Sequence, residues 1–261
     1  MSYRLKTLLL LLLITVLFYS FNSFSANSNE QLPQKAASNA FVVLELFTSQ
    51  GCSSCPAADA QLKKISAQAK TKNLPLYTLS FHVDYWDHLG WKDSFSDELF
   101  TARQYSYARV FSRLNIYTPQ MVVNGTHEFV GSDKSQCERV LSQALQTEND
   151  ESIRLKGNYT AYKDELQIKF EVANSFRGFV NIALVQKEAK INIKRGENSG
   201  RIINYVDIVR AFRQIDWSAG QQGLVTLDKP EDLPDKDIKV IIYLQNKADM
   251  KILNATEAIM L

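Results

Sequence analysis

The sequence predicts an α/β layer fold with a mixed sheet, followed by a domain built mainly from strands. From residue 40 to 149 the pattern alternates strand, helix, strand, helix, hairpin and helix, which is typical of helices packed on a mixed sheet. From residue 150 to 261 helical periodicity fades, and apolar residues alternate with polar ones, as in the segment Leu166 to Val172. About seven such strands in roughly 110 residues indicate a β-sandwich domain.

The elements of the first domain follow from their periodicity and from the residues between them. Its longer segments are expected to form strand, helix, strand and helix at residues 41–47, 54–70, 74–83 and 97–114. Residues 120–123 and 127–130 then form two short strands joined by Asn124-Gly125, the strongest short hairpin signal. A helix that contains Cys137 closes this domain. In the second domain, residues 202–217 hold one long bent strand or a pair of strands.

The N-terminus has the pattern of a secretory signal peptide over residues 1–25. Arg4 and Lys6 form a basic start, an apolar run covers residues 8–18, and small residues favour cleavage after Ser25. An uncleaved anchor is the alternative, although the apolar run is short for a membrane span. Residues 26–39 are polar and without periodicity, which predicts a flexible leader. The sequence therefore predicts a periplasmic or secreted protein.

The charge balance argues against nucleic acid as a partner. The chain has 30 basic and 28 acidic residues, and a mature chain that starts at residue 26 loses two basic residues and no acidic one. Such a chain carries no net charge and so offers no basic field to nucleic acid or to an anionic lipid surface. We expect neither a nucleic-acid partner nor a membrane association beyond the export signal.

Cys52-Ser53-Ser54-Cys55 lies where the first expected strand meets the first expected helix. Two cysteines at this spacing bring their sulfurs within bonding reach, and export allows a disulfide to persist. Unpaired N–H groups and the dipole at a helix N-terminus favour a thiolate, which is the nucleophile of disulfide exchange. We expect Cys52 to be the attacking, more exposed thiol with a depressed pKa. Cys55 is then the resolving and more buried thiol.

The third cysteine, Cys137, is left over once Cys52 and Cys55 pair. An odd cysteine in an exported protein suggests either an intermolecular bridge or a free thiol. The helical pattern around Cys137 favours a small buried side chain instead. A resolving or intermolecular thiol remains the alternative.

Thr118-Pro119 stands directly before the hairpin strand, where a proline fits as a first strand residue. The order of a strand, a C-x-x-C helix start and a Thr-Pro before the hairpin resembles thioredoxin-like folds over residues 40 to about 147. That resemblance implies a cis peptide bond at Pro119, packed against the cysteines, and a wall that an extended peptide can approach. An ordinary trans proline at a strand start is the alternative.

Longer motifs resemble a secreted bacterial family of uncharacterised thioredoxin-like proteins, domain of unknown function 1223. The resemblance covers nearly the whole mature chain and is carried by residues 45–56, 81–87, 118–120 and 195–198. It implies a thioredoxin-like N-terminal domain and no established activity.

Two further side chains are candidates for the site. Glu45 lies on the strand that leads to the cysteines, where a buried acid can accept a proton from the second thiol; a solvated glutamate at a strand end is the alternative. His82 ends the second strand, and functional groups collect at the carboxyl ends of parallel strands. His82 can support the thiolate as imidazolium or bind a metal together with Cys52 and Cys55, unless it is an ordinary hydrogen-bonded histidine.

The leading hypothesis is an exported thiol–disulfide oxidoreductase that uses Cys52 and Cys55, with Pro119 and Glu45 in supporting roles. Its partners are protein thiols or disulfides, or a small thiol, and no cofactor is expected. The alternatives are a copper-binding protein or metallochaperone using Cys52, Cys55 and His82, and a non-enzymatic envelope binding protein with a structural disulfide. The second domain contains no histidine and is expected to position a partner or to shield the thiol site.

Overall fold

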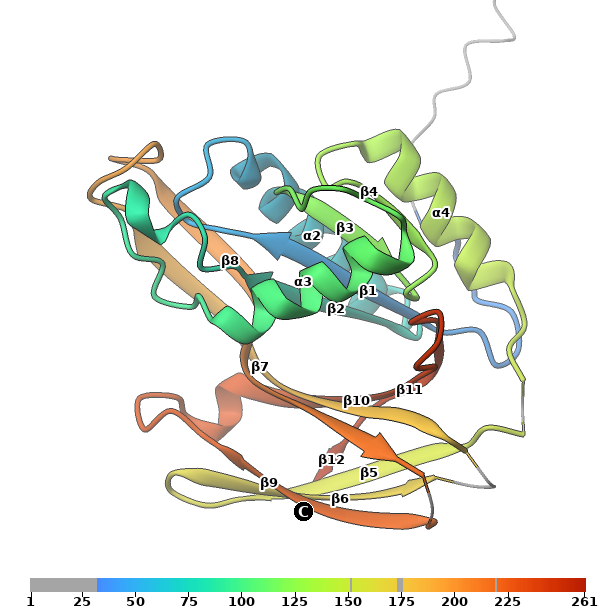
Figure 1. Cartoon of the computed structure of the whole chain (residues 1–261). Coiled ribbons are helices and arrows are strands. Elements are labelled where there is room, and N and C mark those ends of the chain that lie inside the picture. Colours follow the sequence, from blue (N-terminus) through green and yellow to red (C-terminus); the bar gives the residue numbers. More distant parts are fainter. Residues whose placement is uncertain (1–31, 151, 173–175, 219) are drawn as a thin grey trace, which may run out of the picture. The chain divides into compact units, whose positions relative to one another are not determined.

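A computed structural model of the chain describes residues 32–150, 152–172, 176–218 and 220–261, which form two β-sheets and three α-helices (Figure 1). The predicted signal peptide and the first part of the predicted leader lie outside these residues. The larger sheet contains both parallel and antiparallel pairs, so the prediction of an α/β fold with a mixed sheet is confirmed.

The first half follows the expected order with small shifts at element ends. Its elements are β1 (Val42–Thr48), α2 (Cys55–Thr71), β2 (Leu76–His82), a short 3-10 helix (Asp87–Leu89), α3 (Glu98–Val110), β3 (Gln120–Val123), β4 (His127–Val130) and α4 (Lys134–Gln146). Asn124 and Gly125 both adopt positive φ angles, of 48° and 68°, as the Asn-Gly hairpin signal requires. The hairpin prediction is therefore confirmed.

Strands dominate the second half. They are β5 (Leu155–Ala161), β6 (Glu165–Val172), β7 (Gly178–Asn192), β8 (Ile202–Trp217), β9 (Gln222–Asp228), β10 (Ile238–Gln245), β11 (Ile252–Glu257) and β12 (Ile259–Met260), with a 3-10 turn at Asp235–Asp237. The segment 202–217 is one long strand rather than a strand pair. It pairs with β7 along almost its whole length, with a register shift at Leu184/Val185.

One sheet joins the two halves of the chain. Its order is β11-β10-β7-β8-β2-β1-β3-β4, and the junction is a short parallel pairing of β2 with β8 at Ser80 and Ile208. The sequence predicts a sheet for each half, whereas four strands of each half share this one. The pairing covers the edge that β2 would otherwise expose, and an unpaired edge is a liability. The remaining sheet has the order β12-β5-β6-β9.

Alternate residues of β1 enter two different cores. Leu44 and Leu46 pack under α2 and α4, while Val43 and Phe47 pack on the opposite face against α3, β10 and β11. A third apolar cluster fills the space between the four-stranded sheet and strands β7 and β10. The side of the sheet on which a side chain lies therefore decides whether it can reach α2.

Part of the expected leader lies on this body. Leu32 is buried in the core under α2 and α4, and the backbone N–H of Ala37 donates to the carbonyl oxygen of Leu145 over 2.8 Å. The packed body thus begins before residue 40. Among the described residues, no helix is long and apolar enough to cross a membrane.

Candidate functional site

The cysteine turn, residues 49–55, connects β1 to α2. Cys52 and Cys55 form a disulfide with their Cα atoms 5.4 Å apart, and Cys55 is the first residue of α2. Backbone N–H groups close the turn, because Cys52 donates to Ser49 and Cys55 donates to Cys52. Pro56 follows inside the first helical turn, where it removes a donor that has no helical partner. The disulfide therefore lies at a helix N-terminus, as the sequence predicts.

Both cysteines are fully buried, with 0% of each exposed, although Ser53 and Ser54 between them are exposed. The expectation that Cys52 is the more exposed thiol is therefore corrected. Part of the cover comes from the loop after β2. Trp86 lies against Gly51, where an added Cβ would be 3.2 Å from the Cβ of Trp86.

The second half of the chain also packs on the cysteine turn. The β7–β8 tip, residues 193–201, reaches the cysteine turn from nearly 150 residues away. The side-chain amide of Asn198 donates to the carbonyl oxygens of Gln50 and Cys52 over 2.9 and 2.8 Å, and Glu197 accepts from the N–H of Ser53 over 3.1 Å. The sequence pointed to residues 195–198 only through the family resemblance, and gave no signal that they touch the cysteines.

Asp59 supplies the buried carboxyl group of this site. It lies in α2 four residues after Cys55, so the two side chains share one helix face. Its side chain also leans back toward the helix N-terminus. Its Oδ1 accepts a hydrogen bond from the Thr48 hydroxyl over 2.9 Å, while its Oδ2 has no partner among the described residues. Burial raises the pKa of Asp59 to about 7, although nearby His82 opposes the shift. The spacing from Cys55 is the signal that could have identified it.

Glu45, the expected proton acceptor, lies elsewhere. It is buried on the α3 side of β1, where it accepts hydrogen bonds from Arg103 at 2.8 and 3.1 Å and from the Tyr243 hydroxyl at 2.9 Å. Tyr107 also donates to it. The alternation of side chains along β1 places Glu45 on the opposite face of the sheet from Thr48, which bonds Asp59. The proposed role of Glu45 beside the cysteines is therefore corrected to a structural ion pair.

His82 is fully buried at the end of β2. Its Nδ1 lies 2.7 Å from Asp93 Oδ2, and the same oxygen accepts from the backbone N–H of Gln50 over 2.7 Å. Burial lowers the pKa of His82, but the Asp93 carboxylate more than offsets this, and the pKa is raised overall. Asp93 thus ties His82 to the backbone of the cysteine turn.

The Thr118-Pro119 peptide bond is cis, which confirms that prediction. The indole N–H of Trp86, the residue packed on Gly51, donates to the Thr118 hydroxyl over 2.8 Å. Pro119 is buried near α2, since a Cβ added to Gly131 would lie 3.2 Å from the Cβ of Pro119 and 3.0 Å from that of Ala58. Pro119 therefore belongs to the surroundings of the first turns of α2.

Cys137 lies apart from this chemistry. Its thiol is fully buried under α2 and α4, 3.7 Å from the sulfur of Met121. Burial raises its pKa to about 12. This environment agrees with the expectation of a small buried side chain and leaves no reactive thiolate.

Buried polar atoms without partners gather around the cysteine turn. Six such side-chain atoms occur in the described part of the chain, and four of them belong to Asp59, His82, Asn198 and Tyr205. The ring of Tyr205 lies against His82, with centroids 5.0 Å apart. Unsatisfied buried groups are rare in folded proteins and call for an explanation. No group of three His, Cys, Asp or Glu side chains that could hold a metal is found among the same residues.

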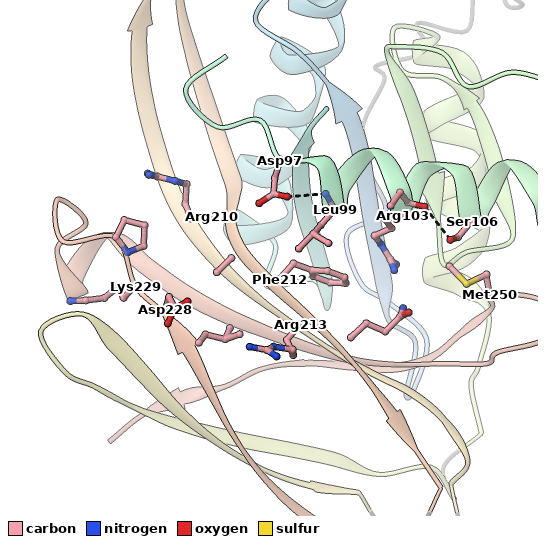
Figure 2. A pocket seen from close by; sticks show the side chains of 15 residues that line it. Asp97, Leu99, Arg103, Ser106, Arg210, Phe212, Arg213, Asp228, Lys229 and Met250 are labelled. Atoms are coloured by element: carbon pink, nitrogen blue, oxygen red, sulfur yellow. Dashed lines mark hydrogen bonds between the residues drawn. The ribbon is translucent and has the colours of Figure 1, made fainter. Parts of the chain in front are cut away.

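A separate cavity of about 850 Å³ lies between α3, β8 and the segment after β9 (Figure 2). Figure 2 shows Arg103, Phe212 and Arg213 in its wall, and Arg103 stacks over the Phe212 ring at 5.0 Å. Several of its charges are already engaged, since Arg103 bonds Glu45 and Lys229 bonds Asp235. Neither cysteine lines this cavity. It is therefore distinct from the disulfide site.

Comparisons with known proteins support the fold. The profile of the family described as "Protein of unknown function (DUF1223)" matches residues 43–245. The crystal structure of protein AGR_C_4864 from Agrobacterium tumefaciens is 29% identical, with a TM-score of 0.59 over 85% of this chain and 96% of that one. No curated protein matches.

Two more distant structures carry no functional argument. A domain of the outer membrane lipoprotein Omp28 from Porphyromonas gingivalis has 7% identity and a TM-score of 0.26, over 44% of this chain and 93% of that one. A β-glucosidase from Listeria innocua has 9% identity and a TM-score of 0.21, over 41% of this chain and 16% of that one.

Proposed function

From the site itself, we propose that this chain, which belongs to the DUF1223 family of unknown function, is an exported thiol–disulfide oxidoreductase. The observation that carries the proposal is the Cys52–Cys55 disulfide at the N-terminus of α2, with the carboxyl group of Asp59 one helical turn behind it. A helix N-terminus favours a thiolate, and thiolates carry disulfide exchange.

The exchange proceeds in two steps. A thiolate attacks the sulfur of Cys52, the Cys52–Cys55 bond breaks, and its electron pair leaves on Cys55. The Cys55 thiolate takes a proton from the Asp59 carboxyl group, whose pKa of about 7 lets it give up and regain a proton near neutral pH. A second thiolate then attacks the partner's sulfur in the mixed disulfide and releases Cys52. Two thiols become one disulfide, the protein disulfide becomes a dithiol, and the reverse reaction uses the same groups.

The proposal includes a division of the fold. We take residues 40–149 to be a thioredoxin-like unit in which Pro119 shapes the wall beside the cysteines. Residues 150–261 are then a β-sandwich that shields the site with the β7–β8 tip. The packing of Trp86 between Gly51 and Thr118 supports the first assignment, and the apolar layer between the two sheets supports the second.

A trapping experiment tests the reaction. The Cys55→Ser variant keeps the attacking thiol, which should attack a disulfide-bonded cysteine peptide, release one half as a free thiol and accumulate as a mixed disulfide with the other half, detected as added mass. Cys52→Ser is the matched control and should accumulate little, because its remaining thiol is the resolving one. Equal trapping by the two variants, or trapping by neither, would refute the assigned roles.

The burial of both cysteines favours a second candidate, a non-enzymatic envelope binding protein with a structural disulfide. The cavity in Figure 2 would then be the place for a ligand. The trapping experiment separates the two candidates, since a structural bridge gives no mixed disulfide with either variant.

Export is part of the proposal and rests on the signal pattern of residues 1–25. We expect the protein in the periplasm or the medium, with a mature N-terminus at residue 26. Cell fractionation and N-terminal sequencing measure both, and a full-length protein retained in the cytoplasm would contradict this localisation.

A further inference from the structure

The buried disulfide raises a question about access. Cys52 and Cys55 have 0% exposure, yet exchange requires a sulfur nucleophile to approach Cys52 along the S–S bond. The exposed Ser53 and Ser54 show that the surface is only a short distance away. Some part of the cover therefore has to move before any thiol reacts.

The β7–β8 tip is the part of the cover that comes from the second half of the chain, and its Gly196 also packs against Trp91. It is closed on itself, because Ile193 donates to Arg201 and Gly200 donates to Ile193 through the backbone. Among the described residues, its hydrogen bonds to the cysteine turn come from two side chains, those of Glu197 and Asn198. A tip with its own internal bonds can leave the turn as a unit.

Asn198 holds the cysteine turn, but only part of its own side-chain hydrogen-bonding capacity is used. The residue is fully buried, its Nδ2 donates to Gln50 and Cys52, and its Oδ1 has no partner in the described part of the chain. The Glu197 contact is exposed to solvent, where a hydrogen bond contributes little. Movement of the tip would release Oδ1 to water, which offsets part of the loss of the other bonds.

The tip covers backbone groups of the cysteine turn that could pair with another backbone. The carbonyl oxygens of Gln50 and Cys52 accept hydrogen bonds, and the N–H of Ser53 donates one. An extended peptide presents the matching N–H and C=O groups along its backbone. The carboxamide of Asn198 and the carboxylate of Glu197 are chemical equivalents of those groups.

We propose that the backbone of residues 50–53 is a docking edge for an extended, cysteine-bearing protein segment, and that Asn198 and Glu197 occupy this edge as a gate. This inference rests on the proposed oxidoreductase function and names its substrate class. The incoming segment replaces the two side chains at the edge, and its thiolate then reaches Cys52. Thiols without a peptide backbone have to wait for the tip to open unaided.

Two rate measurements on the full mature protein test the gate. In the first, dithiothreitol reduces the disulfide, and the appearance of free thiols is followed in time. Asn198→Ala should react about tenfold faster than wild type, the change expected when two neutral hydrogen bonds are lost. Glu197→Ala, an exposed and therefore well-tolerated change, should react about twofold to threefold faster. The matched control is Asn204→Ala, an exposed asparagine on β8, and should react at the wild-type rate.

The second measurement uses an unstructured six-residue peptide with one cysteine, and the same peptide N-methylated at the amides next to the cysteine. The unmodified peptide should reduce wild type several-fold faster, because the methylated peptide lacks the donors next to its cysteine. Unchanged dithiothreitol rates in Asn198→Ala and Glu197→Ala would overturn the gate. Equal rates with the two peptides would overturn the docking edge. Neither rate comparison depends on the reduction potential of the disulfide. The reduction potential therefore tests the oxidoreductase function separately.

Discussion

Replacing Asp59 with asparagine should remove a pH-dependent loss of stability. The pKa of Asp59 rises from 3.8 to about 7 in the folded protein because the carboxyl group is buried. Between these values the folded protein keeps a proton that the unfolded chain releases, so stability falls as the pH rises through this window. Three pKa units correspond to about 4 kcal/mol, lost at about 1.4 kcal/mol per pH unit. Asparagine imitates the protonated acid and keeps an oxygen for the Thr48 hydroxyl.

Urea unfolding of the oxidised protein between pH 4.5 and 8 measures this difference. Asp59→Asn and wild type should have similar stability at pH 4.5, and the variant should gain several kcal/mol by pH 8. His82 contributes a loss of the same sign, because its raised pKa stabilises the fold at low pH and that contribution disappears as the pH rises through it. Asp59 helps to raise the pKa of His82, so the difference between the two proteins measures Asp59 together with its coupling to His82. The exposed Asp164→Asn serves as control, and parallel curves for Asp59→Asn and wild type would refute the reasoning.

Three further predictions follow from the packing. Glu45→Leu leaves the buried Arg103 guanidinium without its carboxylate and should lower the free energy of unfolding in urea by about 3–5 kcal/mol. The rate of disulfide reduction by dithiothreitol should stay unchanged. A slower reduction would show that Glu45 acts at the redox site. Cys137 should resist iodoacetamide at pH 8 in the folded protein, because burial raises its pKa to about 12, so labelling found by mass spectrometry before unfolding would contradict its inert role. Gly125→Ala should lower the free energy of unfolding by more than about 2 kcal/mol, since the added Cβ would lie 1.9 Å from a backbone oxygen. At Gly90 an added Cβ meets open space, so Gly90→Ala should cost only about 1 kcal/mol of left-handed strain. Equal falls in Tm for the two variants would refute the packing argument.

Local chemistry made several features predictable. Asn124-Gly125 specifies its turn because both residues tolerate positive φ. The strand before Cys52 and the helix after it follow from apolar periodicity, so the position of the disulfide followed as well.

Contacts between distant segments were not predictable in this way. The pairing of β2 with β8 joins residues more than 120 positions apart, and no local pattern encodes it. Asn198 stands in a motif of the family resemblance, but no local pattern in the sequence places it beside Cys52. The expectation that Glu45 lies beside the cysteines was wrong for a related reason. Its partner Arg103 lies on a helix whose position the sequence does not reveal. Asp59 resembles any other polar residue of its helix, although its spacing of four residues from Cys55 places both side chains on one helix face.

The reduction potential of the Cys52–Cys55 pair tests the central claim most directly. The mature protein would be equilibrated with glutathione and dithiothreitol buffers of defined potential, and its oxidised and reduced forms quantified by mass after alkylation. A thiol–disulfide oxidoreductase should give a value between about −120 and −270 mV. A value below about −300 mV, typical of structural disulfides, would contradict the account and favour a binding protein with a structural bridge.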